Sequence, residues 1–216
     1  MATHIVLDNL GKIMRTDKSS EGHNYLHFYE RFLFPLREKP ITLIEAGIGG
    51  YHYPDRGGES LRMWAAYFSN PAAKIIGFDV YAKNPDLAPG ATIFHINQID
   101  ETGLINHFGN IPIDVFIDDA SHVNNLSIRT FEIMFPLLKP GGIYIWEDIH
   151  TSYWEQEYNG HPNPLSGKVT AASFLHRLQD GLQVDTLEEQ HRGAWDGHIE
   201  EMHFMRNTCV IIKRKQ

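Results

Sequence analysis

The sequence is poor in cysteine, in basic clusters and in long apolar runs. Its single cysteine, Cys209, cannot form an internal disulfide, so we expect a reducing, cytoplasmic compartment. The formal net charge is −8 and no basic stretch is longer than the terminal Lys213-Arg214-Lys215, which argues against nucleic-acid and anionic-membrane partners. No apolar run approaches the roughly 20 residues of a membrane-spanning helix. The first residues also lack a signal-peptide pattern.

What remains is the composition of an ordinary globular protein. The chain has 216 residues, of which 42% are hydrophobic and 21% charged, enough for one domain with a substantial core. There is no internal repeat, and no Gly/Ser-rich or Pro-rich linker divides the sequence. We therefore expect a single domain over residues 1–216, with a helical extension over about residues 1–38.

Apolar segments alternate with helical patterns along most of the chain. After two N-terminal helical segments (1–15 and 16–38), the expected strands are 41–50 with its glycine turn, 73–80, 91–98, 113–119 and 142–148; helices are expected at 58–68, 101–108, 126–138 and about 168–179. Strands this apolar, alternating with helices, indicate a parallel sheet covered on both faces. Residues 198–205 and 208–215, joined by Arg206-Asn207, predict an antiparallel hairpin. This layout is that of an α/β, Rossmann-like class I methyltransferase fold with a seven-stranded mixed sheet.

Acidic residues follow the expected strands. In an open α/β sheet, ligands bind beyond the carboxyl ends of the strands. The acids at those ends are Glu45, Asp79, Asp118, Asp119, Glu147 and Asp148. We expect them to mark the open rim of the sheet and not to be buried in its core, where a bare carboxylate is costly.

The first turn, "EAGIGG", favours an adenosine-type cofactor. Gly47 and Gly49 allow a ligand to approach the backbone closely, and Asp79 ends the next strand, where an acid can accept hydrogen bonds from ribose hydroxyls. An uncharged turn with acids, including Glu45, suits the cationic S-adenosylmethionine better than a pyrophosphate. No P-loop is present, so nucleoside triphosphate chemistry is not expected.

Asp119, Glu147 and Asp148 follow two strands that should be neighbours. Three converging carboxylates repel each other unless a cation joins them, and oxygen ligands favour Mg²⁺, Mn²⁺ or Ca²⁺ over zinc. His122, three residues beyond Asp119, would stand beside the ion as a general base. The alternative is that these acids cap helices or lie in solvent.

Several segments together resemble a known family, the metal-dependent sugar O-methyltransferases of natural-product pathways, which act on macrolide deoxysugars and rhamnosyl groups and are similar to the cephalosporin-methoxylation protein. They span about residues 14–154 in the same order: "RTDKSSEGHNYLHFYERF", "IEAGIGG", "GGESLRMWAAYF", "GFDV", "FIDDASH" and "FPLLKPGGIYIWEDIHTSYW". Two departures stand out. Ala120 replaces the usual glycine of DDGSH, and the extra N-terminal domain of the macrolide-sugar members is not seen.

The resemblance implies roles for individual residues. Asp119, Glu147 and Asp148 would hold Mg²⁺ (or Mn²⁺), and His122 would be the catalytic base. Implied cofactor contacts are Thr16, Glu45, Gly47, Ser60, Asp79 and Gln98, and we assign Asp118 to the same group.

The expected function is Mg²⁺-dependent methyl transfer from S-adenosylmethionine to a sugar hydroxyl of a natural product or glycoside. A non-sugar diol or a β-lactam acceptor, a non-catalytic cofactor-binding partner subunit, and a hydrolase stay open as alternatives. Tyr153, Trp154 and Tyr158 in the loop 151–166 could stack on a sugar or simply pack on the domain, and Trp195 has the same ambiguity. The aromatic residues of 24–34 suggest a homo-oligomer contact.

Overall fold

The computed structural model describes residues 6–215, so the first five residues of the predicted N-terminal helix lie outside the described residues. The chain divides into two compact units, Met1–Asn97 and Gln98–Gln216, each described below by itself.

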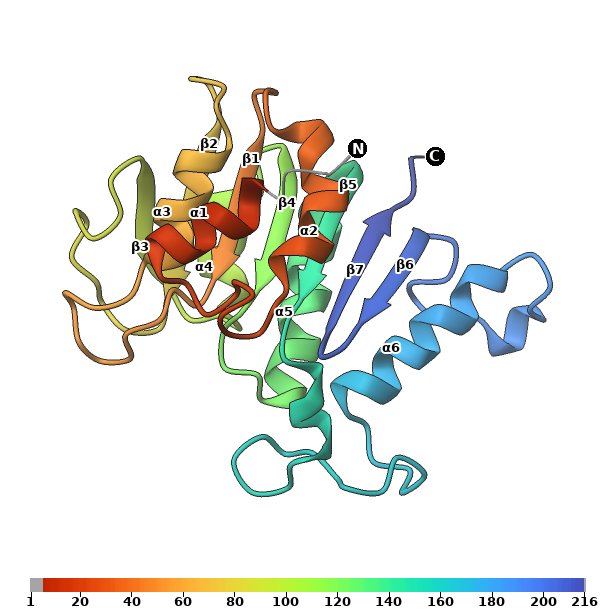
Figure 1. The fold of residues 1–216 in the computed structure, drawn as a ribbon. Coiled ribbons are helices and arrows are strands. Elements are labelled where there is room, and N and C mark those ends of the chain that lie inside the picture. The colour runs from red at the N-terminus through yellow and green to blue at the C-terminus, as the bar shows by residue number, and fades with distance from the viewer. Residues whose placement is uncertain (1–5, 216) are drawn as a thin grey trace. The chain divides into compact units, whose positions relative to one another are not determined.

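Figure 1 draws the fold as a ribbon. The described residues of the first unit form three parallel strands and three α-helices. The strands are β1 (Thr42–Ala46), β2 (Lys74–Asp79) and β3 (Ala91–His95), in the order β3-β2-β1. The helices are α1 (Val6–Met14), α2 (Leu26–Leu33), which leads into the 3₁₀ turn η1 (Phe34–Leu36), and α3 (Glu59–Tyr67). Helix α1 packs against α2 and α3. In α2, Leu26, Tyr29 and Leu33 are buried at the 3-and-4 spacing that predicts an amphipathic helix.

In the second unit, the residues that the structure describes form four strands, in the order β4-β5-β7-β6. Strands β4 (Ile113–Asp118) and β5 (Leu138–Trp146) are parallel, whereas β6 (Ile199–Met205) and β7 (Thr208–Lys213) form an antiparallel hairpin beside β5, drawn in blue in Figure 1. The helices are α4 (Glu101–Phe108), α5 (Asn124–Leu137) and α6 (Ala171–Asp180), with 3₁₀ turns η2 (Ile149–Tyr153), η3 (Gly181–Gln183) and η4 (Glu189–His191).

The seven strands, five parallel and two in a terminal hairpin, agree with the predicted mixed sheet. One strand begins earlier than expected. Strand β5 begins at Leu138, whereas the expected strand began at Gly142. Leu138 pairs with Ile113, and the register shifts before Val115, so an irregularity in the ladder accommodates the proline and glycines inside the strand.

An aromatic cluster forms the core on one side of the second unit. Phe131 of α5 contacts the rings of Tyr144, Trp146, Phe174 and Trp195. Trp195 therefore packs on the core, which resolves its ambiguity in favour of a structural role.

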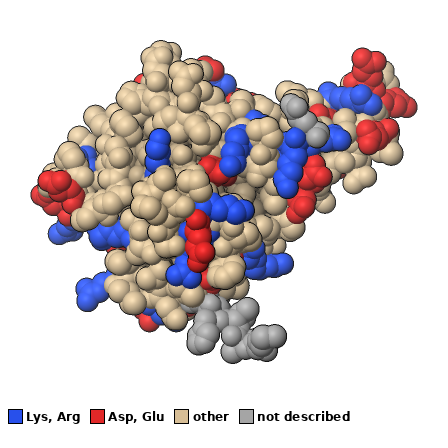
Figure 2. Space-filling model, turned by 90° about the horizontal axis from the view of Figure 1, so that it is seen from above, with Lys and Arg blue, Asp and Glu red and all other residues tan. Residues whose placement is uncertain are grey.

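Basic and acidic side chains are interspersed on the face seen in Figure 2. Among the residues that the structure describes, no helix has both the length and the apolar character needed to cross a membrane.

Cys209 is buried in β7 without a disulfide, and burial raises the pKa of its thiol.

A buried ion pair lies at the centre of the first unit. Glu45 in β1 is fully buried, and its Oε1 lies 3.4 Å from the ammonium of Lys18, which is 1% exposed. Its Oε2 accepts hydrogen bonds from the Ser60 hydroxyl at 2.8 Å and from Trp64 Nε1 at 3.2 Å. These contacts join the loop before α2 to β1 and α3, and the lysine charge compensates for burying the carboxylate.

Replacing Glu45 with Gln should destabilise the protein by about 3–5 kcal/mol, because it removes the negative charge beside a buried ammonium while retaining an acceptor for Ser60 and Trp64. Denaturant unfolding measures the effect. The matched control is Glu59→Gln, which breaks a partly exposed pair with Arg62 and should cost less than about 1 kcal/mol. Adding Lys18→Met to Glu45→Gln should restore part of the loss; no restoration would contradict the ion-pair explanation.

Candidate active site

The ends of β4 and β5 place two acidic pairs at the same level. Asp118 pairs with Trp146 in the parallel ladder, so Asp119 and Glu147 each follow a paired residue. The Glu147 N–H donates to the Asp118 carbonyl at 3.0 Å, extending the contact by one residue. The prediction that these two strands are neighbours is confirmed.

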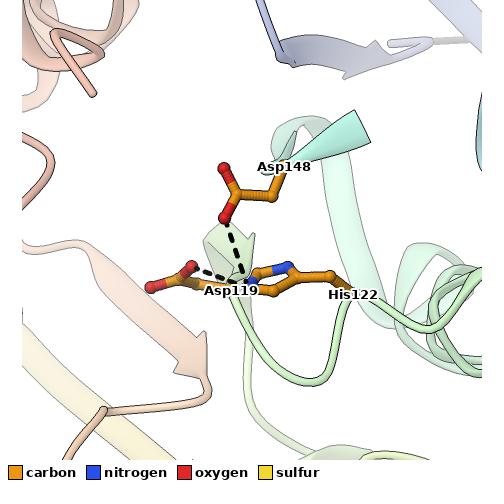
Figure 3. Close-up of side chains that lie close together, drawn as sticks. All are labelled: Asp119, His122 and Asp148. Atoms are coloured by element: carbon orange, nitrogen blue, oxygen red, sulfur yellow. Dashed lines mark ion pairs between the residues drawn. The ribbon is translucent and has the colours of Figure 1, made fainter. Parts of the chain in front are cut away.

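Asp119, His122 and Asp148 converge beyond these strand ends (Figure 3). His122 Nε2 lies 3.7 Å from Asp119 Oδ1 and 3.4 Å from Asp148 Oδ2. One ligand atom from each residue lies within 4.8 Å of the others. All three side chains are partly exposed, so a ligand can reach them. Two carboxylates and an imidazole at this spacing form a donor set that can hold a divalent ion.

His122 and Asp148 owe their positions to left-handed backbone. Their φ angles are 56° and 54°, values that non-glycine residues adopt uncommonly. Each left-handed residue turns the chain sharply after its strand and directs its side chain to the shared site. Ala120 is not among the described residues with positive φ, so replacement of the family's glycine at this position introduces no such strain.

Glu147 differs from its predicted neighbours. It is 2% exposed and is not a member of the group formed by Asp119, His122 and Asp148. The group contains two of the three predicted metal acids, together with the predicted base.

The other acids at the strand ends are also buried, so the expectation that all six mark an open rim is wrong for Glu45, Asp79, Asp118 and Glu147. Burial, with a smaller contribution from the neighbouring Asp119 charge, raises the pKa of Asp118 to about 7, although hydrogen bonds from Tyr144 and the Ala120 backbone oppose the shift. The Tyr144 hydroxyl donates to Asp118 Oδ2 at 3.1 Å. Asp118 therefore points into the core.

The glycine turn of the first unit is held by Asp79. One carboxylate oxygen accepts from the Ile48 N–H at 3.1 Å and the other from the Tyr81 N–H at 2.9 Å. Gly47 and Gly49 have φ of 79° and 75°, a left-handed conformation that glycine adopts readily because it has no Cβ atom. Each oxygen of Asp79 retains a second lone pair for a ligand.

The side chains of the remaining predicted cofactor residues form hydrogen bonds with residues of the same unit. Gln98 donates from Nε2 to the Thr130 hydroxyl at 2.9 Å and accepts from the Ser121 N–H at 3.1 Å, which holds the loop before His122. Thr16 is buried and its hydroxyl accepts from the Lys18 N–H at 3.4 Å. Ser60 donates to Glu45, as described above.

Sequence reasoning missed three residues that support the sites. Lys18 pairs with Glu45. The Thr151 hydroxyl lies against the His122 and Asp148 carbonyl oxygens, and Asn124 donates to the Thr151 carbonyl. The sequence shows that Glu45, an acid inside an apolar strand, needs a cationic or hydrogen-bonding partner, but it does not identify that partner as Lys18. No sequence pattern identifies Thr151 and Asn124, whose hydrogen bonds depend on a loop that returns to the site.

Aromatic residues of the loop after β5 stay available to a ligand. Tyr153 and Trp154 are 41% and 50% exposed. The Trp154 ring makes edge contacts with His150, at a centroid distance of 4.8 Å, and with Tyr158, at 5.4 Å.

Comparisons with known proteins connect this geometry to a chemistry. No protein-family model matches the chain. It is 34% identical over 196 residues to the 8-demethyl-8-alpha-L-rhamnosyl tetracenomycin-C 2'-O-methyltransferase of Streptomyces olivaceus, covering 89% of this chain and 50% of that protein. It is 32% identical over 213 residues to the demethylmacrocin O-methyltransferase of Streptomyces fradiae, covering 96% of this chain and 53% of that protein. The chain is a homologue of natural-product sugar O-methyltransferases.

Solved structures agree with this relationship. MycE methyltransferase from the mycinamycin biosynthetic pathway, in complex with Mg, SAH and mycinamycin VI, is 30% identical and superposes with a TM-score of 0.88 over 96% of this chain and 53% of its own. An O-methyltransferase from Bacillus cereus in complex with SAH is 12% identical, with a TM-score of 0.53 over 99% of this chain and 93% of its own, and supports the fold alone. The Rossmann-like class I methyltransferase fold is confirmed. The chain spans about half the length of the curated relatives it matches.

Mn²⁺ affinity, measured by calorimetry, should distinguish residues that bind the metal from residues that only lie beside it. Changing a residue that only supports a metal ligand typically costs about 10–100-fold in affinity, so loss of a ligand should cost at least as much. We expect Asp119→Asn and Asp148→Asn each to weaken binding by about 100-fold or more. His122→Ala should retain most of the affinity if the ring is a base and lose it if the ring is a ligand.

Glu147→Gln tests whether the third predicted acid also takes part. Glu201→Gln, which changes an exposed carboxylate paired with His203 on β6, is the matched control and should bind Mn²⁺ like the wild type. Wild-type affinity in both Asp119→Asn and Asp148→Asn would exclude this metal centre.

Proposed function

We propose that this protein transfers a methyl group from S-adenosylmethionine to a sugar hydroxyl of a natural product or glycoside, with the help of a divalent cation, Mg²⁺ or Mn²⁺. The observation that carries the proposal is the convergence of Asp119, Asp148 and His122 beyond neighbouring strand ends. The homologues support it, because their names describe sugar O-methyltransferases and MycE was solved with Mg, SAH and mycinamycin VI.

Asp119 and Asp148 are the proposed metal ligands, and Glu147 is proposed as a third. The first two fit the ion because they are partly exposed, carry like charges and face a common point, so they repel one another when no cation is present. When bound, the cation would lower the cost of forming negative charge on an acceptor oxygen. The proposed ligands would fix the position of the cation relative to the acceptor oxygen.

His122 is the proposed general base. Its Nε2 faces the carboxylates of Asp119 and Asp148, which would stabilise the positive charge that the ring gains with the proton. A sugar hydroxyl has a pKa far above that of histidine, so the ring alone cannot deprotonate it in advance. Proton removal must accompany methyl transfer, and a positioned base typically contributes about 10²–10⁴-fold to such a step.

The proposed methyl-donor contacts centre on the glycine turn. Gly47 permits close backbone approach, and Asp79 is oriented by the Ile48 and Tyr81 N–H groups, so its remaining lone pairs are fixed for ribose hydroxyls. Thr16, Glu45, Ser60, Gln98 and Asp118 also belong to the proposed cofactor set. Their contacts within the protein favour a supporting role in which they shape the backbone around the donor.

A non-sugar diol or a β-lactam acceptor would use the same residues, and an acceptor screen distinguishes these cases. A cytoplasmic location, a homo-oligomer and the absence of nucleic-acid partners are further parts of the proposal. The first is supported by the single, buried Cys209.

His122→Ala should lower turnover at least about 10²-fold while leaving S-adenosylhomocysteine affinity nearly unchanged, because only the proton acceptor is lost. Transfer of labelled methyl to a panel of glycosides measures the first quantity, and calorimetry the second. His203→Ala is the matched control, since it removes a histidine paired with a carboxylate at 2.7 Å on β6. Methyl transfer that persists undiminished in His122→Ala, or in excess chelator, would overturn the mechanism.

A further inference from the structure

One hydroxyl group connects the two left-handed residues of the candidate site. Thr151, in η2, is 3% exposed, and its Oγ1 lies 2.9 Å from the His122 carbonyl oxygen and 3.0 Å from the Asp148 carbonyl oxygen. A threonine hydroxyl has a single proton, so the two carbonyls share one donor. The hydroxyl thereby links the end of the β4 loop to the end of the β5 loop.

Both residues that it contacts need support. His122 and Asp148 have φ of 56° and 54°, and a non-glycine residue stays in this region only where its surroundings hold it there. Their side chains extend from those same backbone positions to the ion pair of 3.4 Å between them. A small rotation at either residue would therefore change the distance between the imidazole and the carboxylate.

Thr151 is itself fixed by a buried network. Its N–H donates to the Asp148 carbonyl at 3.1 Å, and its carbonyl accepts from Asn124 Nδ2 at 3.3 Å. Asn124, the first residue of α5, is fully buried, and its Oδ1 accepts from the Ser152 hydroxyl at 3.0 Å and from the Ala171 N–H at 2.6 Å. Asn124 Nδ2 also donates to the Tyr158 carbonyl at 2.7 Å. The backbone of Thr151 therefore cannot move away from the site without breaking its hydrogen bonds with Asp148 and with Asn124 of α5.

We propose that Thr151 is a positioning residue whose hydroxyl holds the backbone of His122 and of Asp148, and so fixes the position of the Asp148 carboxylate and, through it, the affinity of the site for a divalent cation. This inference rests on the proposed function for its metal, but it concerns the hydrogen bonds of a residue that does not itself touch the ion or a substrate. A purely structural role would change stability alone. A positioning role changes metal affinity as well.

The test compares three variants of the full chain. Thr151→Val keeps the shape and removes the hydroxyl, whereas Thr151→Ser keeps the hydroxyl. Thr208→Val is the matched control, because Thr208 is also buried and its hydroxyl donates to the Trp146 carbonyl at 2.9 Å. Mn²⁺ affinity is measured by calorimetry without cofactor, and the melting temperature is measured on the same samples.

Thr151→Val should weaken Mn²⁺ binding by about 10–100-fold, as found for groups that orient metal ligands, and Thr151→Ser should restore it. Thr208→Val should lower the melting temperature and leave the affinity at the wild-type value. Wild-type affinity in Thr151→Val, or an equal loss in Thr208→Val, would overturn the proposal. If Thr151→Val does not unfold cooperatively, Thr151→Ala removes the same hydroxyl and takes its place.

A second readout separates this inference from the proposed function. The ring resonances of His122, recorded by NMR at one pH without metal, should shift in Thr151→Val and not in Thr208→Val. If the wild type binds no Mn²⁺, the proposed metal-dependent function fails, and the resonances alone decide the positioning role. Unshifted His122 resonances in Thr151→Val would then exclude it.

Discussion

Electrostatic repulsion between Asp119 and Asp148 is the constraint around which the candidate site is built. Two carboxylates directed at one imidazole nitrogen are unfavourable unless positive charge lies between them. The parallel register of β4 and β5 brings the residues that follow Asp118 and Trp146 to the same edge of the sheet. Turns with left-handed backbone then direct the side chains inward.

Four of the acids at the strand ends fall into two physical groups. Glu45 and Asp118 are buried and satisfied by Lys18, Ser60 and Trp64 in one case and by Tyr144 in the other. Asp119 and Asp148 are partly exposed and face His122. The first group holds the ends of the strands in place, and the second is able to exchange water for a ligand. Acidic residues thus serve two roles that depend on their burial. The buried ones stabilise the fold, and the partly exposed ones can bind a ligand.

Much of the fold follows from local sequence pattern. Apolar runs predicted β1, β2, β4, β5 and β7, because a strand with many buried positions has few polar residues. Strands β3 and β6 are largely partly exposed or exposed, and they followed instead from the alternation of strands with helices and from the hairpin pattern. The convergence of Asp119, Asp148 and His122 was predictable as well, since parallel strands end at a common edge. Burial of the other acids was not predictable, because it depends on partners such as Lys18 that lie far away in sequence. Nor was the early start of β5, where an irregular ladder overrides the proline and glycines.

The turn of the terminal hairpin has a consequence for the order in which the site can form. The Ile149 N–H, directly after Asp148, donates to the Asn207 carbonyl at 2.9 Å, and Trp146 pairs with Cys209 of β7. During synthesis on the ribosome, Asp119, His122 and Asp148 emerge long before Asn207 does. The nascent chain can thus collapse its earlier strands while the backbone at Asp148 still lacks this anchor. The backbone contacts around Asp148 are complete only once the hairpin has docked.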